Sequence, residues 1–349
     1  MTEGYFHRVE KLTPTVFWVN NPTREEAKLA IAAGALGCTC NPSYCQKMID
    51  HPTEGPYALN LLDQAIRESK DDSEAEAVLQ RLLVKGIADI FRPLYDAKPR
   101  QNGYVSIQGD PIHEHDPRVI IHEGRLHRAM APNVCIKIPC TAAGLTAMET
   151  LIAEDTPINA TEVFGVGQAI SFCELHEQVR ARSGKKPTVY LSHIAGIYDQ
   201  YLQEYVQREN IVISRDVLYQ AGLAVARKVY RLIQERGYHV TLIGGGARGL
   251  QHFTEMVGGD AVVTINWQGT ADKLIESDPP VVERLFNPVP HYVIEELTDK
   301  LPDFKRGYLD DGLRVEEYEE FGPVELFRSM FLKSWKRVLE VANQRRGAL

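Results

Sequence analysis

The feature that most constrains the fold is an alternation of short apolar runs with longer amphipathic stretches. Eight runs have the length and composition of buried strands: residues 15–19, 36–40, 104–108, 134–138, 161–164, 188–192, 240–243 and 261–265. Five stretches between them have helical length and periodicity: residues 24–33, 142–153, 167–183, 215–236 and 249–256. This β-α alternation predicts parallel strands, and eight of them predict a closed (β/α)8 barrel of the TIM type.

The length of the chain suits such a barrel with additional helices. We expect a single domain over residues 1–349, because no linker rich in Gly, Ser or Pro divides the sequence. A helical insertion is expected at residues 44–102, as two helices, and a helical extension at residues 271–349. Within the extension, residues 320–346 predict a long helix on the barrel or over its mouth. Its apolar positions could also face a second copy of the chain, so a homodimer is an open alternative.

The charge and the N-terminal segment exclude several classes of partner. A net charge of -8 opposes binding to nucleic acid, which depends on positive charge that neutralises phosphates. No apolar run approaches the ~18 residues that span a bilayer, and residues 1–14 lack the apolar core of a secretory leader. We therefore expect a cytoplasmic protein that binds a small molecule.

The metal-ligand residue types do not form a recognisable metal motif. Of the six cysteines, three cluster near residue 40 and two flank Lys137, and neither group is followed by a second pair with metal-ligand spacing. His113 and His115 lie in a polar loop without a clear third ligand. We expect reduced, buried thiols and neither a metal nor a cofactor.

Lys137 is the chemical anomaly of the sequence, because it lies between Ile136 and Ile138 on a predicted buried strand. An ammonium group there suffers a large desolvation penalty unless it is paired or deprotonated. The free amine is the nucleophile that attacks a carbonyl to form a Schiff base. Spacing alone is equally compatible with a buried ion pair at Lys137, or with a strand register that points its side chain outward.

Polar residues at the carboxyl ends of the predicted strands could meet at one barrel mouth, where the catalytic groups of such barrels lie. An Asn amide donates and accepts hydrogen bonds, which suits sugar hydroxyls, and an Arg offers a planar fork to an anion. The candidates in chain order are Asn20, Asn21, Asn41, Gln108, Asp110, Asn159, Thr161, Ser192, His193, Arg248, Asn266 and Gln268.

Four motifs, in order along the chain, resemble the signatures of the transaldolase family, which also contains fructose-6-phosphate aldolases. They are Asn41-Pro42-Ser43, VSIQGDP at residues 105–111, IKIPCT at residues 136–141 with Gly144-Leu145, and Asn159-Ala160-Thr161 followed by Gln168-Ala169. Residues 191–196 and 244–248 resemble the family's sixth and seventh strand ends more loosely. The resemblance covers residues 13–270, the whole predicted barrel.

This resemblance implies a role for each matching residue. Lys137 would be the Schiff-base lysine, and Gln108 and Thr161 would relay protons through a water molecule. The implied substrate-binding residues are Asn41 and Asn159 for the donor hydroxyls, and Ser192 and Arg248 for the substrate tail.

The sequence departs from the family at three positions. Asn20 replaces an aspartate that transfers protons after the first strand, and Gln108 replaces a glutamate after the third. Ile197 replaces one of two arginines that hold a phosphate, which puts a phosphate tail in doubt. Asp110 and His193 are the candidates to supply the missing acid-base chemistry, although Asp110 could equally order its loop, and strand alternation points His193 away from the mouth.

The resemblance implies a Schiff-base enzyme that transfers a dihydroxyacetone unit from a ketose or ketose phosphate to an aldose. The first alternative is a class I aldolase of the fructose-6-phosphate aldolase type, which the glutamine at position 108 favours. The second is a catalytically silent member of the family that binds a sugar, which Asn20 and Gln108 together favour.

Overall fold

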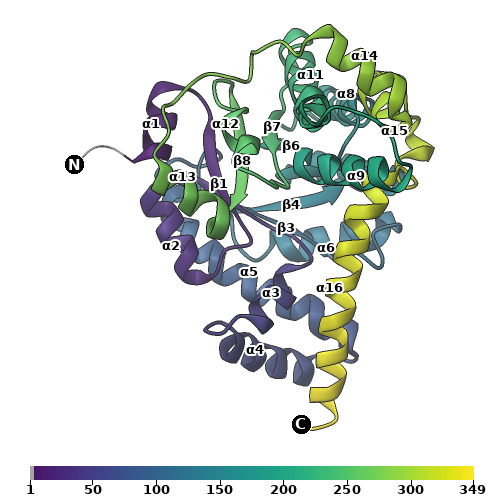
Figure 1. The fold of residues 1–349 in the computed structure, drawn as a ribbon. Coiled ribbons are helices and arrows are strands. Elements are labelled where there is room, and N and C mark those ends of the chain that lie inside the picture. The colour runs from purple at the N-terminus through teal and green to yellow at the C-terminus, as the bar shows by residue number, and fades with distance from the viewer. Residues whose placement is uncertain (1–3) are drawn as a thin grey trace.

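The eight strands form one closed parallel barrel in which neighbours follow chain order and β1 pairs with β8 (Figure 1). The computed structural model describes residues 4–349. The prediction of a (β/α)8 barrel is confirmed. The strands are β1 (Val16–Asn20), β2 (Gly37–Cys40), β3 (Tyr104–Gln108), β4 (Val134–Pro139), β5 (Ile158–Val163), β6 (Val189–His193), β7 (Thr241–Gly244) and β8 (Ala261–Asn266).

Helices connect the strands and cover the outside of the barrel. The best predicted of them have clear end signals: α2 begins with a capping box between Thr23 and Glu26 and ends at Gly34 in the left-handed conformation. Three helices of the barrel layer, α1, α6 and α9, were not predicted. The layer comprises α1 (Tyr5–Leu12), α2 (Arg24–Ala33), α6 (Pro117–Arg128), α7 (Ala142–Ala153), α8 (Val166–Ser183), α9 (Ala195–Arg208), α10 (Arg215–Leu218), α11 (Ala221–Glu235) and α12 (Gln251–Thr254).

Two predicted helical segments are broken into more helices than expected. The insertion holds three helices rather than two, α3 (Tyr44–Asp50), α4 (Gly55–Glu68) and α5 (Asp72–Ala97), and Asp71 caps the last of them. The segment 215–236 divides into α10 and α11. At this break Gly222 donates its N–H to Asp199 at 2.7 Å, and a side chain at Gly222 would lie 2.5 Å from a backbone oxygen of α9. A local cap therefore marks the start of α5, whereas the start of α11 packs closely against α9.

The fifth strand begins at Ile158, earlier than the predicted start at Thr161. Asn159 is a poor strand former by sequence, but in the barrel its backbone pairs with Lys137 and Tyr190. The β5–β6 register shifts between Ala160 and Val163. The strand thus carries an irregularity close to the predicted catalytic positions.

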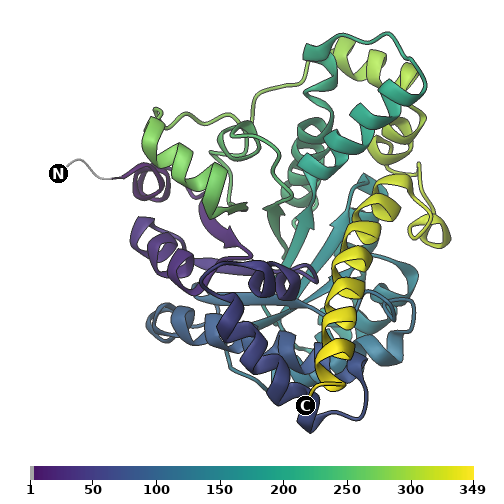
Figure 2. The same ribbon diagram turned by 60° about the horizontal axis from the view of Figure 1, so that its bottom comes forward.

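The C-terminal extension contributes α13 (Asp272–Ser277), α14 (His291–Lys300), α15 (Pro302–Tyr308) and α16 (Gly322–Arg346). Figures 1 and 2 show the yellow ribbon of α16 running from beside α9 to beside α4. This helix contacts α3, α4, α5, α9 and β5, so it joins the insertion to the barrel. Arg345 near its end donates two hydrogen bonds to the carboxylate of Asp63 on α4, at 2.5 and 2.6 Å.

The packing of α16 can be tested at Trp335, which is fully buried. Replacing Trp335 by Ala removes its buried contacts and leaves a cavity, so we expect the free energy of unfolding to fall by about 3–5 kcal/mol in urea denaturation. The control is Lys336→Ala on the exposed side of the same helix, which should stay within about 0.5 kcal/mol of the parent. Equal stability of the two variants would contradict core packing of α16.

Candidate active site

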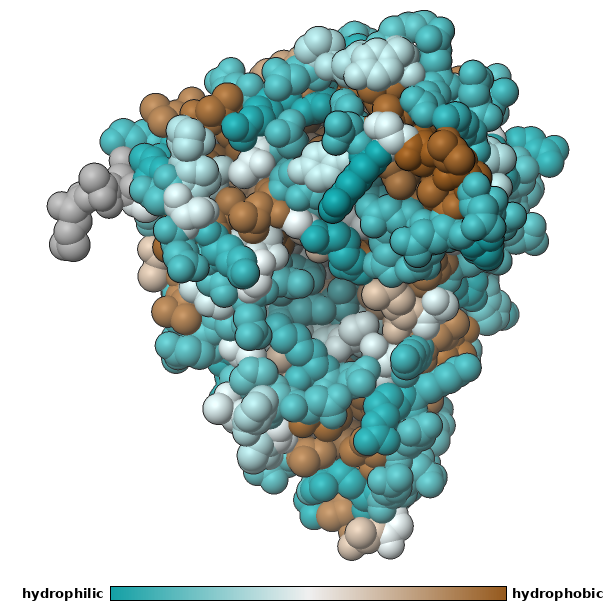
Figure 3. All heavy atoms as spheres, in the orientation of Figure 1, coloured by the Kyte–Doolittle hydropathy of each residue, from teal (hydrophilic) through white to brown (hydrophobic). Residues whose placement is uncertain are grey.

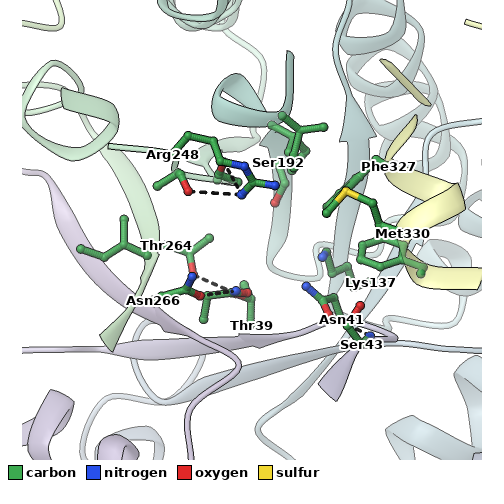
Figure 4. A pocket seen from close by; sticks show the side chains of 18 residues that line it. Thr39, Asn41, Ser43, Lys137, Ser192, Arg248, Thr264, Asn266, Phe327 and Met330 are labelled. Atoms are coloured by element: carbon green, nitrogen blue, oxygen red, sulfur yellow. Dashed lines mark hydrogen bonds between the residues drawn. The ribbon is translucent and has the colours of Figure 1, made fainter. Parts of the chain in front are cut away.

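Lys137 lies on β4 with its backbone between Gln108 on β3 and Asn159 on β5. Its side chain is 5% exposed and lines a cavity of about 130 Å³ at the carboxyl end of the barrel (Figure 4). Burial lowers the pKa of the Lys137 ammonium to about 8, against the opposing effect of the Glu162 carboxylate. The amine therefore points inward, and a substantial fraction of it is neutral near physiological pH.

The cavity is lined by polar groups from several strand ends and closed on one side by α16. Figure 3 shows the corresponding face of the molecule hollowed near its centre, with mostly hydrophilic residues around the hollow. Phe327, Met330 and Phe331 of α16 supply an apolar wall, and Figure 4 shows two of them on the same side as Lys137. The polar lining residues are Asn20, Thr39, Asn41, Ser43, Lys137, Ser192, Arg248, Thr264 and Asn266.

Asn41 is held so that its amide nitrogen stays available. Its side-chain oxygen accepts hydrogen bonds from the Asn21 amide at 2.9 Å and from the Ser43 backbone N–H at 3.0 Å. Asn21 has a left-handed φ of 45° and also accepts from the Asn41 backbone N–H. The NH₂ group of Asn41 has no hydrogen-bond partner among residues 4–349, so it can donate to a hydroxyl of a bound ligand.

Asn159 and Ser192 form a buried chain of hydrogen bonds beside Lys137. The Ser192 hydroxyl donates to the Asn159 oxygen at 2.7 Å, and the Asn159 amide donates to Ser106 at 3.4 Å. Ser192 lines the cavity, whereas Asn159 supports it from the neighbouring strand. The predicted substrate-binding residues Asn159 and Ser192 are therefore brought together.

Gln108, Thr161 and Glu162 form a second buried group next to Lys137. The Gln108 amide donates to Glu162 Oε1 at 2.8 Å. Glu162 Oε2, Gln108 Oε1 and Thr161 Oγ1 are buried and have no hydrogen-bond partner among the described residues. Burial raises the pKa of Glu162 to about 7, while the hydrogen bond from Gln108 and the charges of Lys137 and Arg328 act to lower it.

Asn20 belongs to a ring of neutral polar side chains around the cavity. Its amide donates to Asn266 at 2.9 Å, and its oxygen accepts from the Thr39 hydroxyl at 2.9 Å. Thr39 also lies 2.7 Å from the hydroxyl of Thr264. This ring can orient hydroxyl groups, but an amide such as that of Asn20 has no proton to exchange near neutral pH.

The two residues named as replacements for the missing carboxylates are both engaged elsewhere. Asp110 accepts from the Ile112 backbone N–H at 2.7 Å and lies 2.6 Å from the His113 ring, so it orders its loop. His193 contacts the backbone oxygens of Val163 and Gly222, each at 3.0 Å, outside the cavity. Burial lowers the pKa of His193 to about 4, which leaves its ring neutral at pH 7.

Arg248 lies on the cavity rim, after β7. Its guanidinium donates to Gln200 at 2.8 Å and more weakly to the backbone oxygens of Gly246 and Ala247. Its backbone N–H donates to His252, whose ring contacts the buried Asp199 carboxylate at 2.9 Å. This network fixes the loop and leaves the Arg248 guanidinium among the lining residues of the cavity.

Glu162 was not among the residues singled out from the sequence. Strand alternation places neighbours on opposite sides of a strand, so selecting Thr161 as inward-facing implied that Glu162 pointed outward. The signal that could have identified it is the same as for Lys137, a charged residue within a predicted buried strand.

The residues described by the structure offer no group of three or more potential metal ligands close enough to hold an ion. All six cysteines are free and buried, with the sulfurs of Cys38 and Cys40 3.8 Å apart. None of the helices in residues 4–349 is long and apolar enough to span a membrane.

Comparison with known proteins gives a family match over most of the chain. The model of the family described as Transaldolase/Fructose-6-phosphate aldolase matches residues 17–312. Transaldolase 1 of Streptomyces avermitilis is 36% identical over 157 residues, which cover 43% of this chain and 41% of that protein. A transaldolase of Acidothermus cellulolyticus is 28% identical over 239 residues, 63% of this chain and 62% of the relative. One of Thiobacillus denitrificans is 26% identical over 255 residues, 66% of this chain and 68% of the relative.

The lowered pKa of Lys137 predicts unusual reactivity toward a small amine reagent such as cyanate. Only the neutral amine reacts, so carbamoylation of Lys137 should rise with pH through a midpoint of about 8, whereas ordinary lysines have pKa values near ~10.4. Peptide mass spectrometry across a pH series measures this, with the exposed lysines of the same digest as internal controls. A midpoint near that of the exposed lysines would contradict the desolvation of Lys137.

Proposed function

The chain belongs to the transaldolase/fructose-6-phosphate aldolase family, and we propose that it transfers a dihydroxyacetone unit from a ketose to an aldose through a Schiff base on Lys137. The observation that carries this proposal is the buried Lys137 amine with a pKa near 8, which faces a cavity of polar side chains. A neutral amine in this setting is suited to attack on a carbonyl.

The proposed reaction begins when the Lys137 nitrogen adds to the ketose carbonyl and the adduct loses water to give an iminium ion. The bond between C3 and C4 of the ketose then breaks, its electron pair moves into the iminium, and an aldehyde leaves. The resulting enamine on Lys137 attacks the carbonyl carbon of an aldose acceptor. Hydrolysis of the new iminium releases the longer ketose and restores the amine.

The remaining lining residues suit recognition of such a substrate. The free NH₂ group of Asn41 and the Ser192 hydroxyl, which Asn159 orients, can bind the hydroxyls of the donor unit. Arg248 on the rim is the positive group placed to hold an anionic tail such as a phosphate. Ile197 also lines the cavity, so the part of the cavity near Arg248 offers one guanidinium and one apolar side chain.

An aldolase reaction is the second candidate function, favoured by the amide at position 108. In that reaction the enamine is protonated on carbon and hydrolysed, which releases dihydroxyacetone instead of passing it to an acceptor. The two reactions share every step up to the enamine.

Trapping with sodium borohydride tests the Schiff base. With fructose 6-phosphate and a panel of other ketoses, reduction of the imine should add a stable mass to the peptide that contains Lys137. The Lys137→Met variant, of similar length and without an amine, is the control and should show neither the adduct nor turnover. If no ketose gives an adduct with the parent protein, both enzymatic functions fail and a silent sugar-binding protein remains.

Dependence on an acceptor separates transfer from aldol cleavage. With a ketose that gives the adduct, we expect product to form at full rate only when an aldose acceptor is present, because the enamine then attacks a carbonyl carbon. Release of free dihydroxyacetone, assayed by its reduction to glycerol, is the measurement. Accumulation of dihydroxyacetone at the same rate without an acceptor would instead establish an aldolase.

A further inference from the structure

We propose that Glu162 is the proton-transfer group for carbon-carbon bond cleavage at Lys137. This inference rests on the proposed Schiff-base function and adds a residue to it. The cleavage step needs a base, because the hydroxyl on C4 of the ketose must lose its proton as the C3–C4 bond breaks.

The backbone of β5 brings the Glu162 side chain to Gln108 and close to Lys137. Lys137 and Asn159 are register partners and face inward, so alternation along β5 would also turn Thr161 inward and Glu162 outward. Instead, Glu162 has a left-handed φ of 57°, and the pairing with β6 is irregular at this point. The side chain consequently reaches Gln108 at 2.8 Å, and its charge acts on Lys137.

A single buried amide holds this irregular segment in place. The Gln168 NH₂ group donates to the backbone oxygens of Glu162 and Cys140, each at 3.1 Å. Its oxygen accepts from the backbone N–H groups of Phe164 at 2.9 Å and Gly165 at 3.0 Å. Gln168 thus pairs four buried backbone groups around the end of β5, and these hydrogen bonds hold the left-handed residue in place.

Three other carboxylates around this end of the barrel make structural contacts. Asp110 orders its loop, and Glu123 accepts from the Asp110 backbone N–H at 3.1 Å. Glu114 is ion-paired with Arg328 at 3.0 Å. Glu162 Oε2, Glu114 Oε2 and both oxygens of Glu76 are buried without a partner among the described residues. Of these three carboxylates, Glu162 is the one whose charge acts on Lys137.

The electrostatic surroundings suit a group that both takes and returns a proton. The charged groups that act on Glu162 are Lys137, Arg328 and Glu319, and Glu162 in turn acts on Glu114. Burial outweighs the two cations and raises the pKa of Glu162 to about 7. A carboxyl group with this pKa exchanges protons near neutral pH far more readily than the amides of Asn20 and Gln108.

In the proposed step, the Glu162 carboxylate takes the proton from the C4 hydroxyl as the C4 oxygen forms a carbonyl. The C3–C4 electron pair moves into the iminium on Lys137 and gives an enamine. In transfer, the enamine carbon bonds to the acceptor carbonyl carbon, and the Glu162 carboxylic acid returns its proton to the acceptor oxygen. Protons and electron pairs therefore balance over the two half-reactions.

The Glu162→Gln variant tests the assignment, because the amide oxygen can still accept the hydrogen bond from Gln108. Imine formation at Lys137, measured by borohydride trapping, should persist within about threefold, whereas kcat for ketose cleavage should fall about 10²- to 10⁴-fold. The carboxylate is the active form, so the parent's kcat should rise with pH through about 7. The rise of kcat with pH should be absent in E162Q.

Two further variants separate chemistry from structure. Exchange of the pair, Gln108→Glu with Glu162→Gln, keeps one carboxylate and one amide in the same hydrogen bond, and should restore kcat at least tenfold over E162Q. The matched control is Glu123→Gln, because burial also raises the pKa of Glu123 to about 7, but this residue is committed to a loop contact. Its kcat should stay within twofold of the parent.

Several outcomes would overturn the proposal for Glu162. One is an E162Q protein that cleaves ketose at the parent rate, and another is an exchange variant no more active than E162Q. A third is an equal loss of borohydride trapping and of turnover in E162Q, which would mean that Glu162 acts only by setting the protonation state of Lys137. In each case an adduct on the parent protein leaves the Schiff-base function standing, whereas absence of that adduct removes the function itself.

Discussion

The desolvation of one amine, Lys137, is the constraint on which the rest of the site depends. The closed barrel surrounds the side chain on β4 and removes most of its contact with water, which favours the uncharged amine. The Glu162 carboxylate acts against this effect, so the pKa settles near 8 rather than falling further. The lowered pKa of Lys137 therefore follows from a balance between burial and neighbouring charge.

The fold carries most of the neutral polar residues of the site and its titratable residues on different strands of the barrel. Neutral side chains on β1, β2 and β8 hold each other in a polar ring, and Asn159 with Ser192 supports the opposite side. The titratable groups lie together on β4 and β5, where α16 covers the cavity with apolar side chains. Because both side chains are buried, the interaction between the charges of Lys137 and Glu162 is stronger than it would be in water.

The sequence was sufficient for the barrel and for most of the residues that meet at its mouth. Strand positions could be predicted because buried parallel strands are short and continuously apolar, and α2 and α7 because their end signals are local. The missed boundaries depend on contacts between distant segments. Asn159 becomes part of β5 because its backbone pairs with β4 and β6, and Gly222 at the start of α11 packs against α9.

The sequence by itself determined that a lysine would lie within a buried strand of a barrel, because apolar context is a property of the local chain. Only the tertiary structure decided which carboxylate faces that lysine. Alternation would send Glu162 outward, but its left-handed backbone conformation, held by Gln168, brings its side chain to Gln108 instead. That turn depends on hydrogen bonds among β4, β5 and α8, which no local pattern of residues specifies.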